Sequence, residues 1–276
     1  MDYTQIQFEG TTESQNEILV ALLDNIGFEG FEENIGILKA CIPTGQFDEA
    51  MFNSVIDINR FKYSKSIINK ENWNAKWEAE FQPISIYYPN STKPFVYLKA
   101  GFHEANNEFE YNIEITPKMS FGTGHHATTY LMVEQMSGIN FEGKTTIDFG
   151  TGTGVLAILA EKLGSKHILA IDCDDWSIEN TMENIEKNQC KAIETLQAYT
   201  IPTGNKADII LANINLNIIS DNIVQIKNAC LPHTKILFSG IMQHDKDNII
   251  SVLQNNGIEV NQVYKKDNWL AIMASY

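Results

Sequence analysis

Arginine is nearly missing from this 276-residue sequence, in which Arg60 is the only one. Lysines supply the rest of the 20 basic side chains, and the 35 acidic side chains leave a formal net charge of −15. Proteins that bind nucleic acids neutralise phosphates with clustered lysine and arginine, and often read bases with the arginine fork. We therefore expect no direct nucleic-acid binding. The charge favours a basic partner through long-range attraction, although it could also serve only solubility.

Metal motifs and long apolar runs are absent as well. The cysteines are Cys41, Cys173, Cys190 and Cys230, and their spacing contains no C-x-x-C pair of the zinc or redox type. No apolar run approaches the roughly 18 residues of a membrane helix. The first five residues show neither the basic nor the apolar region of a secretory signal. We expect a monomeric cytoplasmic protein with reduced cysteines, no metal site and no membrane association.

The first 70 residues predict a small α+β domain. Stretches with period-two alternation of apolar residues are interspersed with stretches of helical spacing, and Gly27 follows the first predicted helix as a stop signal. The predicted elements are a strand over 3–8, a helix over 13–26, strands over 28–32 and 36–42, a helix over 47–56 and a strand over 60–68. This β-α-β-β-α-β order predicts a ferredoxin-like domain over residues 1–70.

Three aromatic residues follow at four-residue intervals, namely Trp73, Trp77 and Phe81. On a helix this spacing places them along one stripe. We predict a linker helix over residues 71–82 whose stripe packs against the next domain, with ligand stacking as the alternative. Residues 83–116 predict short strands interrupted by proline and glycine.

From residue 117 onward, strands alternate with helices, which predicts a parallel sheet with crossover helices. The predicted strands cover 144–149, 166–172, 207–213 and 235–241. Two last strand-like runs, over 258–264 and 269–275, predict an antiparallel hairpin at the edge of this sheet. We expect residues 83–276 to form one α/β catalytic domain.

A glycine-rich turn is the clearest ligand signal. The strand ending at Phe149 runs directly into the sequence GTGTG, and a helical stretch begins at Val155. Such a turn lets the backbone approach a ligand while free N–H groups at the helix start point toward it. Asp172 lies 22 residues after Gly150 at the end of the next strand, where a ribose could donate hydrogen bonds to it. The pattern predicts a nucleotide site that includes Gly150, Gly152 and Asp172.

The spacing of the glycines distinguishes between cofactors. A dinucleotide fingerprint G-x-G-x-x-G would need glycine at position 155, where Val155 stands. The chain has D-x-G-x-G-x-G instead, with Asp148 two residues before the first glycine. A carboxylate there suits a cationic ligand such as S-adenosylmethionine and would repel a pyrophosphate. The turn therefore favours a methyltransferase over a dinucleotide enzyme; a tight turn without any ligand is the remaining alternative.

Two further polar segments are expected near this turn. Asn213 ends an apolar strand, where its side chain would face the ligand crevice. There it could accept a hydrogen bond from an amine and aim the nitrogen lone pair at a methyl group. The alternative is that Asn213 only forms an Asx turn at the strand end. The segment FGTGHHATT precedes a helix predicted from Tyr130, and its adjacent histidines lack a further ligand at metal spacing. We expect this loop to fold over the cofactor with a threonine hydroxyl touching it, unless Thr128 or Thr129 only caps the helix.

Together, the segments FGTGHHATT, DFGTGTGVLAILAEKLG, IDCDD and DIILANI resemble the PrmA family, which methylates protein eleven of the large ribosomal subunit. The segments NWNAKWEAEFQPI and DNWLAIMA resemble the connecting helix and the last strand of that family. The resemblance implies a Rossmann-like, class I methyltransferase domain that uses S-adenosylmethionine, preceded by a ferredoxin-like recognition domain. It also implies methylation of lysine side chains and of the N-terminal amine of that ribosomal protein.

The resemblance also assigns roles to individual residues. The family's cofactor contacts fall on Thr129, Gly150, Asp172 and Asn213, and we expect Asn213 to orient the substrate amine as the catalytic residue. After the asparagine the family usually continues with Ile-Leu-Ala or similar, whereas here Asn213-Ile214 leads into Asn215-Leu216-Asn217, and this departure affects the expected shape of the substrate mouth. Residues 1–70 carry 11 acidic and 5 basic side chains, a net charge of −6, which fits attraction of a basic substrate.

Other functions fit parts of the pattern. Asparagine at a strand end also serves adenine methylation, but Ile214-Asn215-Leu216 offers no aromatic residue to stack a flipped base, so a methyltransferase of rRNA or another nucleic acid is the first alternative. A NAD-dependent oxidoreductase is the second alternative. The third is a module that binds the ribosomal protein without methyl transfer.

Overall fold

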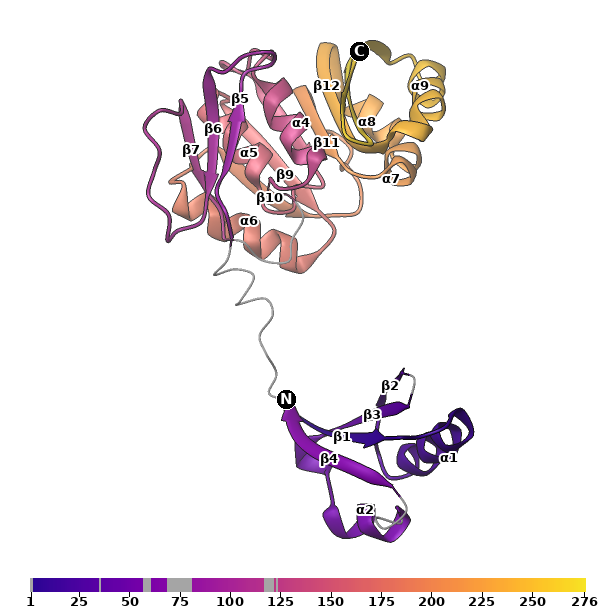
Figure 1. Ribbon diagram of the computed structural model, residues 1–276. Helices are drawn as coiled ribbons and strands as arrows, with labels where there is room; N and C mark the ends of the chain where they lie inside the picture. The colour runs from indigo at the N-terminus through magenta and orange to yellow at the C-terminus, as the bar shows by residue number, and fades with distance from the viewer. Residues whose placement is uncertain (1, 35, 57–60, 69–80, 117–121, 123) are drawn as a thin grey trace. The chain divides into compact units, whose positions relative to one another are not determined.

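The computed structural model describes the chain except for residues 1, 35, 57–60, 69–80, 117–121 and 123. The chain divides into two compact units, Met1–Lys76 and Trp77–Tyr276, which we describe separately (Figure 1). The linker helix predicted over 71–82 lies, up to residue 80, outside the described residues.

The N-terminal unit has the predicted β-α-β-β-α-β order. Its elements are β1 (Tyr3–Glu9), α1 (Glu13–Asp24), β2 (Gly30–Asn34), β3 (Ile37–Pro43), the short 3-10 helix η1 (Thr44–Gln46), α2 (Glu49–Val55) and β4 (Lys62–Ile68). The strands form an antiparallel sheet in the order β2-β3-β1-β4. Helix α1 begins with a capping box in which Thr12 and Gln15 satisfy each other's backbone N–H groups. This is the arrangement expected of a ferredoxin-like domain.

Aromatic packing holds this unit together. Phe8 of β1 is fully buried, and its ring centroid lies 6.5 Å from that of Phe52, 6.1 Å from that of Phe61 and 6.0 Å from that of Tyr63. The ring therefore joins β1 to α2 and β4. Since a domain of this size buries comparatively little surface, one such ring is a large share of its core.

The second unit begins with a small three-stranded sheet and continues with a doubly wound α/β arrangement. Its elements are β5 (Ile84–Tyr87), β6 (Pro94–Lys99), β7 (Tyr111–Glu114), α4 (Ala127–Met136), β8 (Thr145–Phe149), α5 (Val155–Lys162), β9 (His167–Asp172), α6 (Asp175–Lys187), β10 (Ile193–Gln197), β11 (Ala207–Asn213), α7 (Leu216–Asp221), α8 (Ile223–Ala229), β12 (Cys230–Met242), the 3-10 helix η2 (Gln243–Asp245), α9 (Lys246–Asn255), β13 (Glu259–Lys266) and β14 (Trp269–Ser275).

The main sheet has the order β10-β9-β8-β11-β12-β14-β13. Its first five strands run parallel, while β14 pairs antiparallel with both β12 and β13. This confirms the predicted Rossmann-like class with an antiparallel hairpin at the edge. Strand β10 was not predicted, because its sequence Ile-Glu-Thr-Leu-Gln is short and half-exposed.

Helices cover both faces of this sheet (Figure 1). Alternate residues of each strand point to opposite faces, so Ile168 packs in the core with α4 and α5 while Leu169 packs in the core with α7, α8 and α9. The small sheet of β5, β6 and β7 joins the core of α4 and α5. Among the described residues, no helix has the length and apolar content needed to cross a membrane.

The strand order reverses beside β8. From β8 the chain proceeds to β9 on one side of it, whereas β11 lies on the other side. In open α/β sheets the crevice at such a switch point, outside the carboxyl ends of the strands, is where ligands bind. The predicted glycine turn and Asn213 both lie at this edge.

We expect Phe8→Ala to unfold the N-terminal unit selectively. Removing a buried phenylalanine costs about 3–5 kcal/mol, which is comparable with the total stability of a small domain. Hydrogen exchange on the full chain should show loss of amide protection in β1–β4 with protection retained in β8–β12. Phe102→Ala is the control, because Phe102 is 59% exposed, and it should leave both units protected. Unchanged protection of β1–β4 in Phe8→Ala would contradict this account of the core.

Candidate functional site

A cleft of about 360 Å³ lies at the carboxyl edge of the main sheet. Four predicted site residues line it, namely Gly150 and Gly152 after β8, Asp172 at the end of β9 and Asn213 at the end of β11. The fifth, Thr129 on α4, lines an adjoining cavity of about 20 Å³ that it shares with Gly150 and Asn213. The structure thus brings all five residues together at one place. Their contact with a cofactor stays a prediction.

The glycine turn connects β8 to α5 through left-handed backbone conformations. Gly150, Gly152 and Gly154 have φ angles of +82°, +57° and +78°, which residues with a Cβ adopt only with strain. The N–H groups of Gly150 and Thr151 both donate to the Ile171 carbonyl, at 2.8 and 2.9 Å. Glycine is therefore required here by the backbone itself.

Asp172 is held in place by backbone donors. Its Oδ2 accepts a hydrogen bond from the Gly152 N–H at 2.9 Å, and its Oδ1 accepts one from the Asp174 N–H at 3.1 Å. Each carboxylate oxygen has a further lone pair, so the side chain can still accept hydrogen bonds from a ligand. This geometry suits the predicted role of Asp172 toward a ribose.

Two glycines enclose Ile214, the residue after Asn213. A Cβ on Gly150 would lie 2.2 Å from the Ile214 Cγ2 atom, and a Cβ on Gly240 would lie 2.4 Å from the Ile214 carbonyl oxygen. The ends of β8, β11 and β12 can approach this closely only because both positions lack a side chain. Ile214 and Gly240 both line the cleft, so this contact shapes its floor.

The amide of Asn213 is oriented by Thr129. The Asn213 Nδ2 donates to the Thr129 Oγ1 at 3.4 Å. The Asn213 Oδ1 is buried and has no hydrogen-bond partner among the described residues. A buried acceptor without a partner is costly, which indicates that a ligand donor belongs there.

Asp148 was expected to contact the cationic end of a ligand, but it is not among the described residues that line either cavity. It lies fully buried beneath the turn, where its Oδ2 accepts a hydrogen bond from the Thr151 hydroxyl at 2.7 Å. Burial raises the pKa of Asp148 to about 7, against the opposing effects of the Thr151 hydroxyl and the Ala157 N–H. Its role in the structure is to brace the turn from below.

The HHATT segment begins α4 earlier than predicted. The helix starts at Ala127 and its N-cap is His126, so the alternative that Thr128 or Thr129 caps the helix is wrong. Both threonines are buried within the first turn of the helix. His126 lines the cleft, and its ring meets the Trp269 ring edge-on at a centroid distance of 4.7 Å.

Several residues that line the cleft were not predicted from the sequence. Tyr199 follows the unpredicted β10 and is 82% exposed, while Trp269 begins β14. Asn215 belongs to the segment that departs from the family pattern, and its Oδ1 caps α7 by accepting from the Ile218 N–H at 3.0 Å. The alternation of strands and helices calls for a strand after α6, and predicting that strand would have placed Tyr199 at its carboxyl end. No pattern in the sequence around Trp269 indicates that it reaches this edge of the sheet.

The family comparison identifies one family over most of the chain. The family model described as ribosomal protein L11 methyltransferase (PrmA) matches residues 7–276. A ribosomal protein L11 methyltransferase of Phocaeicola vulgatus is 33% identical, with 99% of this chain and 98% of that protein covered. The protein of the same name from Chlorobaculum tepidum is 35% identical over 93% of this chain and 91% of its own length.

A solved structure agrees with these relatives. The crystal structure of a ribosomal protein L11 methylase from Lactobacillus delbrueckii subsp. bulgaricus superposes with a TM-score of 0.62 at 27% sequence identity. The superposition covers 69% of this chain and 97% of that one.

We expect Gly150→Ala to weaken binding of S-adenosylmethionine more than tenfold, because its Cβ would displace Ile214 from the cleft floor. Gly143→Ala is the matched control at the other end of β8, since Gly143 has φ +67° and a Cβ added there would meet no atom within 4 Å. Placing alanine in a left-handed backbone conformation costs about 1–2 kcal/mol in both variants. Only Gly150→Ala should lose affinity for S-adenosylmethionine in calorimetric titration. Equal affinities would show that the contact with Ile214 does not matter.

Asp148→Asn should change how stability depends on pH. The folded pKa near 7 lies above the unfolded value, so the folded state holds this proton more tightly and loses relative stability as pH rises from about 4 to 7. Between pH 5 and pH 7.5 the unfolding free energy of the wild type should fall by on the order of 2 kcal/mol relative to Asp148→Asn. Urea titrations of both proteins at these pH values measure it; a constant difference would mean that Asp148 is ionised throughout.

Proposed function

The chain belongs to the ribosomal protein L11 methyltransferase (PrmA) family, and from this premise and the cleft we propose that it methylates ribosomal protein L11 with S-adenosylmethionine as the methyl donor. The modified groups that we propose are lysine side chains and the N-terminal amine. The observation that carries this proposal is the buried Oδ1 of Asn213 beside the glycine turn, which has no hydrogen-bond partner in the part of the chain that the structure describes. It is an acceptor suited to an amine N–H.

The residues of the cleft fit S-adenosylmethionine. The turn at Gly150 and Gly152 leaves room for close approach of the ligand, and the Asp172 carboxylate can accept hydrogen bonds from ribose hydroxyls. Asn213 and Thr129 line the small cavity that adjoins this cleft. When bound, the cofactor supplies a methyl group activated by a positive sulfur.

Asn213 would position the amine for an in-line displacement. Its Nδ2 is engaged by Thr129, and its Oδ1, which has no hydrogen-bond partner among the described residues, remains available to accept an N–H of the amine. Fixing one N–H in this way fixes the direction of the nitrogen lone pair, and orientation of the reacting groups supplies much of the rate in such transfers. No covalent bond to the enzyme is needed.

The amine must enter in its neutral form, because a protonated nitrogen has no lone pair. A lysine amine has an unperturbed pKa of about 10.4, and a partly apolar cleft lowers it by disfavouring the charged form. Phe149, Ile214 and Trp269 provide apolar lining. We propose that the proton passes to water as the side chain enters.

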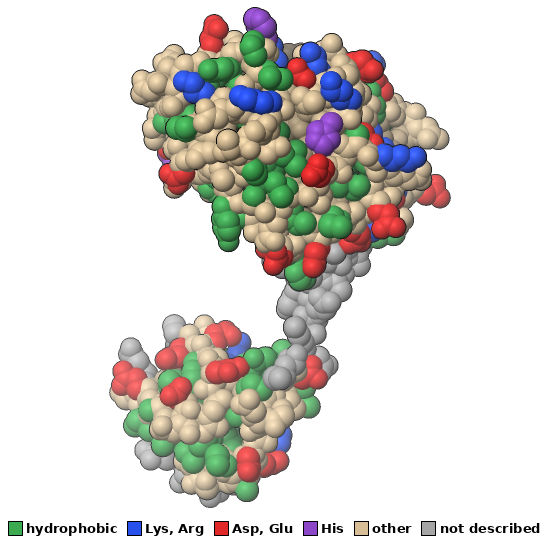
Figure 2. All heavy atoms as spheres, turned by 180° about the vertical axis from the view of Figure 1, so that it is seen from behind, with side chains coloured by type: hydrophobic (Ala, Val, Ile, Leu, Met, Phe, Trp, Pro, Cys, Tyr) green, Lys and Arg blue, Asp and Glu red, His purple; other side chains and the backbone are tan. Residues whose placement is uncertain are grey.

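We propose that the N-terminal unit recognises the basic substrate. On the face shown in Figure 2, acidic side chains prevail over basic ones on this unit, in line with the net charge of −6 for residues 1–70. Acidic surfaces accelerate encounter with a cationic partner, an effect that weakens with salt.

The proposal is tested by incubating the protein with labelled S-adenosylmethionine and total ribosomal proteins, then with ribosomal RNA. We expect one labelled protein, L11, with label on lysine side chains and the N-terminal amine when its peptides are analysed by mass. Label on RNA or on a different protein would overturn the proposed substrate. Absence of any label together with absence of cofactor binding would overturn the proposed activity.

Asn213→Ala should lower the turnover number by about 100-fold, the scale of a lost orienting contact, while cofactor affinity changes much less. Asn248→Ala is the matched control, because Asn248 is the same residue type, is exposed on α9 and is not among the described residues that line either cavity. It should keep wild-type turnover. Full turnover in Asn213→Ala would remove the proposed role of this amide.

A further inference from the structure

Helix α6 buries a stripe of polar side chains. Its buried residues are Ser177, Asn180, Thr181 and Asn184, which recur at helical spacing where an amphipathic helix ordinarily presents apolar residues. Burial of polar groups costs free energy unless they are hydrogen-bonded. The stripe therefore needs an explanation in the contacts that it makes.

Two members of the stripe hold the glycine turn. The Thr181 Oγ1 donates to the Gly152 carbonyl at 2.9 Å, and the Asn184 Nδ2 donates to the Thr153 carbonyl at 2.8 Å. Both side chains are fully buried. Two consecutive carbonyls of the turn are thus fixed by side chains of α6.

Gly152 is held from both sides. Its carbonyl accepts from Thr181, while its N–H donates to the Asp172 carboxylate, which lines the cleft. Because a peptide unit is planar, holding a carbonyl fixes the direction of the N–H that follows it. The contacts of α6 therefore fix the peptide units that follow Gly152 and Thr153, directly beside the part of the turn that lines the cleft.

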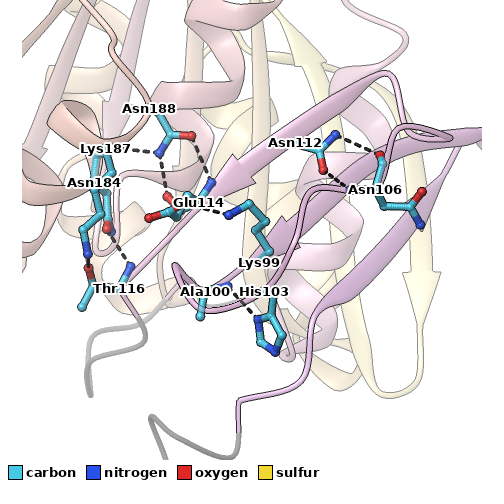
Figure 3. A network of polar contacts seen from close by, with 10 residues as sticks. All are labelled: Lys99, Ala100, His103, Asn106, Asn112, Glu114, Thr116, Asn184, Lys187 and Asn188. Atoms are coloured by element: carbon cyan, nitrogen blue, oxygen red, sulfur yellow. Dashed lines mark hydrogen bonds and ion pairs between the residues drawn. The ribbon is translucent and has the colours of Figure 1, made fainter.

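The same contacts extend to two neighbouring segments. The Asn184 Oδ1 accepts from the Thr116 N–H at 2.7 Å, just after β7 (Figure 3). The Thr153 hydroxyl donates to the Gly122 carbonyl at 2.9 Å, and Gly122 lines the small cavity that adjoins the cleft. Asn184 thus links β7 to the glycine turn, and Thr153 links the glycine turn to the segment that precedes α4.

Asn188, four residues after Asn184, bonds to β7 and to the Asn184 carbonyl but to no described residue of the glycine turn. Its Oδ1 accepts from the Glu114 N–H at 3.0 Å, and its Nδ2 donates to the Glu114 carbonyl at 2.6 Å (Figure 3). Within the described part of the chain, its side chain forms no hydrogen bond with the glycine turn. Asn184 lies within α6 and Asn188 is its C-cap, and both hold the β7 segment, but they differ in their connection to the site.

We propose that Thr181 and Asn184 are positioning residues that preorganise the glycine turn for the cofactor. Neither is among the described residues that line the two cavities, so they act through Gly152 and Thr153. Without them the turn would have to be ordered during binding, which lowers affinity. This inference rests on the proposed function, since it assigns their effect to the S-adenosylmethionine site.

The test compares variants that lose a hydrogen bond to the glycine turn with variants that keep it. Thr181→Val keeps the shape of the side chain and removes the hydroxyl, whereas Thr181→Ser keeps the hydroxyl. Calorimetric titration with S-adenosylmethionine should show affinity reduced about tenfold in Thr181→Val and wild-type affinity in Thr181→Ser. Asn184→Ala should behave like Thr181→Val, and Asn188→Ala should bind as the wild type does.

Steady-state kinetics distinguishes a role in positioning the cofactor site from a general loss of folded, active enzyme. In Thr181→Val the KM for S-adenosylmethionine should rise by the same factor as the dissociation constant, with the turnover number within about twofold of wild type. Wild-type affinity in Thr181→Val, or an equal loss of affinity in Asn188→Ala, would overturn the inference. Failure of the wild type itself to bind S-adenosylmethionine would instead overturn the proposed function.

Discussion

The site depends on a backbone that turns sharply while nearly every polar group in it stays hydrogen-bonded. Residues 150–154 pass through three left-handed positions, and neighbouring elements supply partners on each side of them. The Ile171 carbonyl and the Asp172 carboxylate receive N–H groups, while Thr181 and Asn184 donate to carbonyls. The cleft is therefore an outcome of how β9 and α6 pack on the turn, and its shape is as rigid as those contacts.

The parts of the site that the sequence predicted are the local ones. A strand, a glycine turn and a helix follow one another within 20 residues, so the ligand site that they form can be recognised from consecutive residues. Asp172 and Asn213 each lie at the end of a predicted strand. The family resemblance added Thr129. What could not be predicted are contacts between distant segments, such as the enclosure of Ile214 between Gly150 and Gly240.

The errors have physical causes of the same kind. Asp148 was expected at the ligand because a carboxylate two residues before the turn is close in sequence, but the alternation of side chains along β8 directs it into the interior. Helix α4 was expected from Tyr130, with a threonine N-cap as the alternative to a cofactor contact, yet His126 is the N-cap and Thr129 lies in the first turn, where it meets Asn213. In both cases tertiary packing overrode a sound local preference.

The order of the last strands has a consequence for how the protein is made. Strand β14 lies between β12 and β13 although it follows both in the chain, so β13 has no place in the sheet until β14 has been synthesised. Trp269, which lines the cleft, is the first residue of that strand. During translation the glycine turn and its neighbours can assemble early, but the wall of the cleft is completed last. The cleft therefore receives Trp269 only when the final hairpin folds.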